Sequence, residues 1–135
     1  MRDIVNSTST SEVKKVWMRG AILIRDDAKR RAPILQSDKH GLKWWQRPGA
    51  LKNAIFAAYG KEDAPNVLVG VNYRLAPQAH WIEFGTAFRD TRKGAARGSS
   101  PPHPYMRPAL AAQQNNAMDA MAQGYRELIE KAATK

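Results

Sequence analysis

The sequence predicts a small α+β fold in one domain over residues 1–135: a long N-terminal helix, a small antiparallel sheet, a long basic loop and a C-terminal helix packed on the sheet. Two segments with apolar residues at helical spacing lie near the two ends of the chain. A valine-rich segment with alternating faces lies between them, and a Gly/Ser/Pro-rich run precedes the last helix. Strands grouped between helices favour an α+β fold.

A first helix is expected over residues 10–32. Residues 7–11 provide hydroxyl groups for its N-cap, and Pro33 ends it. Its apolar stripe is formed by Val13, Val16, Trp17, Ile24 and Ala28. Gly20, in the middle of the helix, costs about 1 kcal/mol relative to alanine, so we expect another element to approach closely there.

Residues 33–49 follow no regular period and predict a loop that is flexible over about 34–49. Trp44 and Trp45 stand next to each other in it, and exposed tryptophans are uncommon. Two interpretations stay open. The loop folds back on the core, or the tryptophans form a contact with another subunit.

Two strands are expected to pair as an antiparallel hairpin. Residues 50–59 alternate in polarity, and residues 67–73 place Val67, Val69 and Val71 on one face. The turn-forming residues 60–66 separate the two segments.

Residues 79–85 favour a short helix closed by Gly85 over a strand. Residues 86–103 predict a flexible loop by composition, with a strand pair at its base as a further option. The segment that carries its basic side chains is either a solvated loop or an arm that becomes ordered when it binds a partner. These candidate inter-subunit arm residues are Arg89, Arg92, Lys93 and Arg97.

The C-terminal helix is expected to begin around Pro108, with the proline at the first helical position, where its missing N–H costs nothing. Leu110, Met121, Tyr125 and Leu128 follow helical spacing, and we expect this stripe to pack on the sheet.

The composition points to an acidic partner and to self-association. The net charge of +10 suits nucleic acid, an acidic protein surface or anionic lipid. Leu, Ile, Val and Phe make up fewer than one residue in five, so the core is thin, which favours oligomers. No apolar run suggests a signal peptide or a membrane span, and the chain has no cysteine.

No catalytic, metal or cofactor site is predicted, so we expect a protein that is not an enzyme. His40, His80 and His103 lie in different predicted elements, without the spacing of metal ligands. The serines lack a nucleophile-elbow context, and no pair of acids suggests general acid–base catalysis.

Several short motifs occur in an order that resembles a family of bacteriophage neck proteins, the head–tail joining or tail-completion proteins of long-tailed phages. The earlier motifs are Ala32-Pro33, the Gly-x-Leu-Lys stretch at 49–52 and the Val-Gly-Val stretch at 69–71. Two later blocks are more specific, "HWIEFGT" at 80–86 and "PYMRPA" at 104–109. The family motif residues carried over to this chain are Glu83, Phe84, Gly85, Thr86, Pro104, Tyr105, Met106, Arg107 and Pro108.

The resemblance implies a structural virion protein that forms a ring of six or twelve copies at the phage neck. The ring would join the portal or adaptor proteins of the DNA-filled head to the tail terminator or tail tube protein. It implies contact with genomic DNA in the lumen as an option, no cofactor, no membrane, and assembly in the host cytoplasm. The alternative is a basic nucleic-acid-binding module encoded by a phage or prophage.

Glu83 is expected to be structural. It stands between Ile82 and Phe84, near the core boundary, where a lone carboxylate needs a partner. Arg107 in the second block is the predicted partner, and the pair would tie the two ends of the 86–103 loop together.

Overall fold

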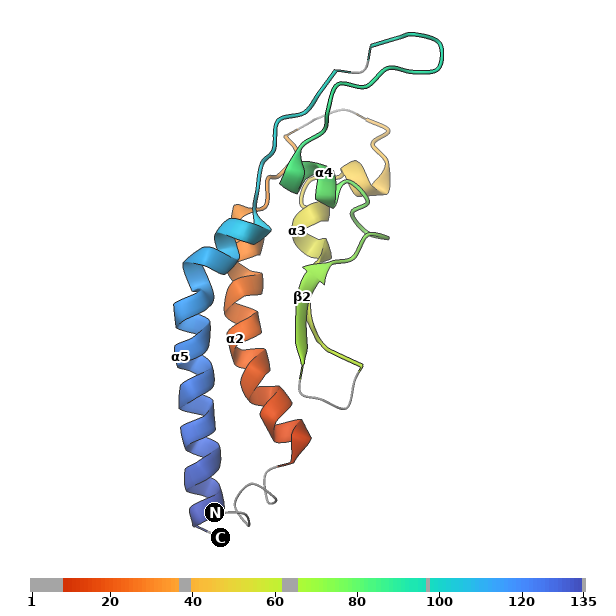
Figure 1. Ribbon diagram of the computed structural model, residues 1–135. Coiled ribbons are helices and arrows are strands. Elements are labelled where there is room, and N and C mark those ends of the chain that lie inside the picture. Colours follow the sequence, from red (N-terminus) through yellow and green to blue (C-terminus); the bar gives the residue numbers. More distant parts are fainter. Residues whose placement is uncertain (1–8, 37–39, 62–65, 97, 135) are drawn as a thin grey trace.

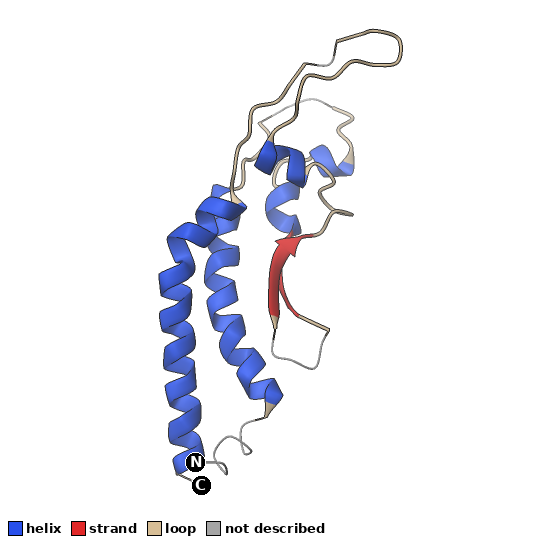
Figure 2. Ribbon diagram, in the orientation of Figure 1, coloured by secondary structure: helices blue, strands red, loops and turns tan. Residues whose placement is uncertain are grey.

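The computed structural model describes residues 9–36, 40–61, 66–96 and 98–134. It shows the predicted α+β fold, with two long helices beside a small antiparallel sheet (Figures 1 and 2). The elements are α2 (Thr10–Arg31), the 3-10 turn η1 (Trp44–Gln46), α3 (Ala50–Ala54), β1 (Ile55–Tyr59), β2 (Val67–Val71), α4 (Ala79–Phe84) and α5 (Met106–Ala133).

Helix α2 begins and ends as predicted. The Ser9 side chain accepts a hydrogen bond from the Glu12 N–H, and the Glu12 carboxylate accepts one from the Ser9 N–H. This capping box satisfies two N–H groups that the helix itself leaves without partners. At the other end the chain leaves the helix at Ala32, immediately before Pro33.

The two long helices run antiparallel, and two glycines let them approach closely (Figure 1). A Cβ on Gly20 would lie 2.9 Å from Met121 Cε, and a Cβ on Gly124 would lie 2.8 Å from Val16 Cγ1. The close approach expected at Gly20 is therefore a helix–helix contact. Along the same contact the Trp17 indole N–H donates to the Tyr125 hydroxyl.

The apolar stripe on α5 was predicted to pack on the sheet, and the structure shows a different arrangement. Met121 and Tyr125 face α2, whereas Leu110 is exposed. The glycine contacts place α2 against this face of α5, so α5 meets the sheet near its N-terminal end. There Met106 and Ala109 share the core with Ile55.

The hairpin is antiparallel, as predicted, and pairs Ile55 with Val71 and Tyr59 with Val67. The strand predicted over 50–59 was wrong in its first half, because residues 50–54 form α3. Gly49 adopts φ 80°, which turns the chain after Pro48, and its carbonyl accepts the Asn53 N–H in the first helical turn. In so short a segment alternation does not distinguish a turn of helix from a strand.

The core consists mostly of small residues. Alanines at positions 28, 32, 54, 76, 79 and 109 surround Ile55 and Tyr105, the two large side chains that are fully buried in the described residues. Many large apolar side chains are exposed instead, on the sheet, on α4 and on α5. A single copy therefore leaves much apolar surface in contact with water.

Candidate functional site

The two sequence blocks of the family motif meet at one buried carboxylate. Glu83, in α4, is 4% exposed. Its Oε2 accepts the N–H of Tyr105 at 2.7 Å and of Met106 at 3.0 Å, and its Oε1 accepts the N–H of Arg107 at 3.1 Å. Glu83 therefore caps the first turn of α5 from another element, with negative charge at the positive end of the helix dipole.

The predicted pairing of Glu83 with Arg107 is confirmed, although it is the smaller part of the contact. Arg107 Nε donates to Glu83 Oε1 at 3.2 Å, and the Arg107 guanidinium lies 4.8 Å from the centre of the Phe84 ring. The Arg107 side chain is 62% exposed, so solvent screens the ion pair. The three backbone donors were not foreseen, because a sequence pattern does not show which carboxylate reaches a distant helix end.

The cap also explains where α5 starts. Because Glu83 supplies acceptors for the N–H groups at 105–107, the helix begins at Met106 rather than at Pro108. The sequence predicted Pro108 at the first helical position, whereas it is the third residue of the helix. It still fits, because the N–H groups of the first turn have no acceptor within the helix.

The environment of Glu83 keeps it ionised. Burial alone raises the pKa of its carboxyl group, but the hydrogen bonds from the backbone N–H groups of Met106, Tyr105 and Arg107, with that of the Arg107 side chain, outweigh burial and hold the pKa below its ordinary value. Next to it, burial and the negative charge of Glu83 raise the pKa of the Tyr105 hydroxyl, which donates to the Ala79 carbonyl oxygen at 3.3 Å.

Residues 86–103, here called the arm, lie between these two blocks, and the described parts, 86–96 and 98–103, form an irregular hairpin that projects beyond α4 (Figure 1). At its base the Thr86 N–H donates to the Ser100 carbonyl oxygen at 2.9 Å, and the His103 N–H donates to the Ile82 carbonyl oxygen at 2.7 Å. Isolated bridges join Thr86 to Ser100 and Asp90 to Ala96. In place of the strand pair that the sequence left as an option, the loop therefore has only these isolated bridges in its described residues.

Gly85 allows the arm to leave α4 so sharply. It adopts φ 74°, and a Cβ there would lie 2.8 Å from both the Ser100 carbonyl oxygen and the Pro102 nitrogen. Any other residue would meet strain and a clash with the returning chain. The "FGT" part of the motif is therefore explained by the geometry of the arm's base.

The described basic side chains of the arm lie on the surface. Arg89, Arg92 and Lys93 are exposed, whereas Arg97 lies outside the described residues. Arg89 lies 5.5 Å from the centre of the Trp81 ring, which in turn contacts His80. Phe88, on the same arm, is largely exposed.

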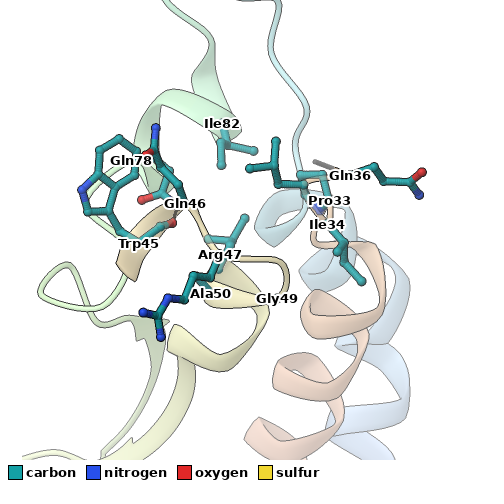
Figure 3. Close-up of a pocket in the computed structure, with 12 residues that line it drawn as sticks. Pro33, Ile34, Gln36, Trp45, Gln46, Arg47, Gly49, Ala50, Gln78 and Ile82 are labelled. Atoms are coloured by element: carbon teal, nitrogen blue, oxygen red, sulfur yellow. Dashed lines mark hydrogen bonds between the residues drawn. The ribbon is translucent and has the colours of Figure 1, made fainter. Parts of the chain in front are cut away.

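The tryptophan pair is divided between two environments. Trp44 is exposed, whereas Trp45 lines a pocket of about 500 Å³ together with Pro33, Ile34 and Ile82 (Figure 3). The Trp45 carbonyl oxygen accepts a hydrogen bond from Gln78 Nε2 at 2.8 Å, which holds the loop against α4. Trp45 thus follows the interpretation in which the loop folds back, whereas the subunit contact of Trp44 stays a prediction.

Within the described residues no group of three or more His, Cys, Asp or Glu side chains could hold a metal ion. No helix in this part of the chain is long and apolar enough to cross a membrane. Comparison of the chain with protein-family models, with curated proteins and with solved structures gave no match.

Proposed function

We propose that this chain is a non-enzymatic structural protein of a bacteriophage neck, where several copies form a ring that joins the head to the tail. The observation that carries the proposal is the base of the arm, which hydrogen bonds hold in place. Glu83 links the two blocks that resemble the neck-protein family, and the arm projects between them. Such a base holds a contact segment at a defined position outside the fold.

The exposed apolar surface supports assembly. Phe56, Leu68 and Phe84, together with Met118 and Ile129, are all more than one-third exposed. Surfaces of this kind on a small protein mark sites of protein–protein contact. The small, alanine-rich core leaves further stability to be gained by burial between copies.

The charge of the arm suits attachment to an acidic surface of the neighbouring head or tail protein. Each exposed ion pair contributes about 0–1 kcal/mol, so one arm alone attaches weakly. Equivalent arms around a ring act together and multiply this effect. The attachment should therefore weaken as the salt concentration rises.

The test is a variant in which all four basic arm residues are changed to Ser. Its melting curve should match that of the parent, because the described side chains among them are exposed. Head–tail joining should fail, seen as unattached tails and capsids in micrographs. The matched control removes the same charge elsewhere, at exposed Lys15, Arg47, Lys61 and Arg126. Normal joining by the arm variant would contradict the proposed role of the arm.

One observation favours the alternative of a nucleic-acid-binding module. The Tyr73, His80 and Trp81 rings form a continuous strip, with centres 6.1 and 4.9 Å apart, and Arg89 lies over the last ring. Aromatic side chains beside arginine are typical of surfaces on which bases stack. Binding to random DNA with a steep salt dependence would favour this alternative, and assembly onto purified tails would favour the neck protein.

A further inference from the structure

The face of the sheet that points away from α2 is entirely apolar. Successive residues of a strand point to opposite faces, so Phe56 and Ala58 share this outer face with their partners Gly70 and Leu68. Phe56 lies over Gly70, where a Cβ would be 3.7 Å from Phe56 Cζ, and Leu68 is 57% exposed. None of these four residues has a polar side chain.

Such a face is unusual for a sheet in contact with water. An antiparallel sheet that packs on one side normally carries polar residues on the other, whereas a sheet covered on both sides is apolar throughout. The inner face already packs on α2, with Ile55 fully buried. The outer face therefore has the composition of a surface that a further layer covers.

Helix α5 carries a matching apolar strip on the flank that α2 leaves open. Met118, Ala122 and Ile129 are separated by four and seven residues, which places them on one side of the helix, with exposed Arg126 at its edge between Ala122 and Ile129. All three are exposed, Met118 to 65% and Ile129 to 56%. The strip is about 16 Å long, close to the length of a five-residue strand.

The two apolar surfaces lie on different sides of the molecule. The hairpin and α5 both contact α2, which runs between them (Figure 1). The strip on α5 therefore cannot cover the outer sheet face of its own chain. Two different surfaces that fit each other give a head-to-tail contact, which closes into a ring when the rotation between copies allows it.

Charge favours α5 over the other elements as the covering layer. Lys52 and Arg74, both exposed, flank the Ile55–Val71 end of the hairpin, and the opposite end combines Lys61 with Glu62 and Asp63 in the sequence. Over Met106–Ala133 helix α5 has three acidic and three basic residues, a net charge of zero in a chain of +10. Helix α2, with seven basic and three acidic residues, would be repelled.

We infer that the outer face of the β1–β2 hairpin in one copy binds the Met118–Ala122–Ile129 strip of α5 in the next copy. The occupant is thus a second copy of this chain, and the contact is heterologous. The contact depends on the proposed function only for its place in a neck ring, because the two surfaces belong to this chain alone.

Disulfide cross-linking tests the contact directly, because the chain has no cysteine. One copy carries Leu68→Cys, and a second, tagged copy carries Met118→Cys. After mild oxidation the mixture should give a dimer with one tagged and one untagged chain, and each variant alone should give almost none. The matched control replaces Met118→Cys by Gln123→Cys, an exposed position on another side of α5.

Two outcomes would overturn the inference. Efficient cross-linking of Leu68→Cys with itself would show that sheets meet sheets in a symmetric dimer. Equal cross-linking through Gln123→Cys would show that the contact is not specific to the strip.

A second measurement needs no cysteine. Sedimentation over a dilution series gives the protein concentration at which the assembly dissociates. For Leu68→Asp this concentration should be about tenfold higher than for the parent. The melting curve of the monomer should be unchanged. Tenfold corresponds to about 1.4 kcal/mol. A parent chain that stays monomeric up to about 1 mM, a contact weaker than about −4 kcal/mol, would also overturn the inference. If the protein is found at the neck of virions but this cross-link does not form, the inferred contact between the two surfaces is wrong. The proposed function would still stand in that case.

Discussion

Replacing Glu83 by Gln should destabilise the fold more than removal of Arg107. Glu83→Gln keeps one oxygen and turns the other into an amide nitrogen, which faces the N–H donors of the α5 N-terminus. Hydrogen bonds to a charged group contribute about 1.5–3 kcal/mol each, and the substitution loses the charge and half of the acceptors. We expect a loss of about 3 kcal/mol. Arg107→Ala should cost about 1 kcal/mol or less, because the Arg107 side chain is 62% exposed and solvent screens its charge.

Urea unfolding followed by circular dichroism measures both losses at neutral pH. The pKa of Glu83 is lowered in the folded state, so its stabilising contribution is complete above the ordinary value of 4.5 and is lost as the pH falls through the lowered pKa. The parent and Glu83→Gln should therefore become more similar in stability in strong acid. Equal losses for Glu83→Gln and Arg107→Ala at neutral pH would refute the view that the backbone donors carry the contact.

Three further predictions concern packing and the arm. Gly124→Ala should cost about 1–3 kcal/mol in the same unfolding assay, because the added methyl group meets Val16, and an unchanged stability would show that the helices are further apart. Ile55→Ala should cost about 2–5 kcal/mol, whereas Leu110→Ala, at an exposed position, should stay within about half a kcal/mol. Limited proteolysis should cut the parent first within the arm, and a first cut inside α5 would contradict the bracing of its N-terminus by Glu83.

The elements with strong local signals were predictable from the sequence. The Ser9 cap and Pro33 bound α2, and Gly85 closes α4 as expected. The antiparallel pairing of the hairpin follows from the alternating valines and the short turn. These features depend on residues close together in the chain, where capping and periodicity act.

The misjudged features depend on contacts between distant segments. The stripe on α5 was assigned to the sheet because periodicity shows that a face is buried and not what covers it. The glycines that bring α2 against this face are 104 residues apart in the sequence. The start of α5 likewise depends on Glu83, more than twenty residues earlier.

At the candidate site, the ion pair of Glu83 with Arg107 was predictable from the sequence. The capping of the α5 N-terminus by Glu83 was not. A lone carboxylate near the core boundary needs a partner, and charge complementarity with Arg107 predicted the pair. The Phe84 and Trp81 contacts with arginines, and the wholly apolar outer face of the sheet, need the register and the spatial neighbours. Sequence alone provides neither.

The proposed place of this protein is the junction between phage head and tail. Gold-labelled antibodies against the protein, applied to particles released by cells that carry its gene and imaged by electron microscopy, test it most directly. Gold is expected at the neck of complete virions, and on one end of tails that have not joined a head or on the portal of isolated heads. Gold along the whole tail, or protein recovered only outside the particles and bound to nucleic acid, would contradict it.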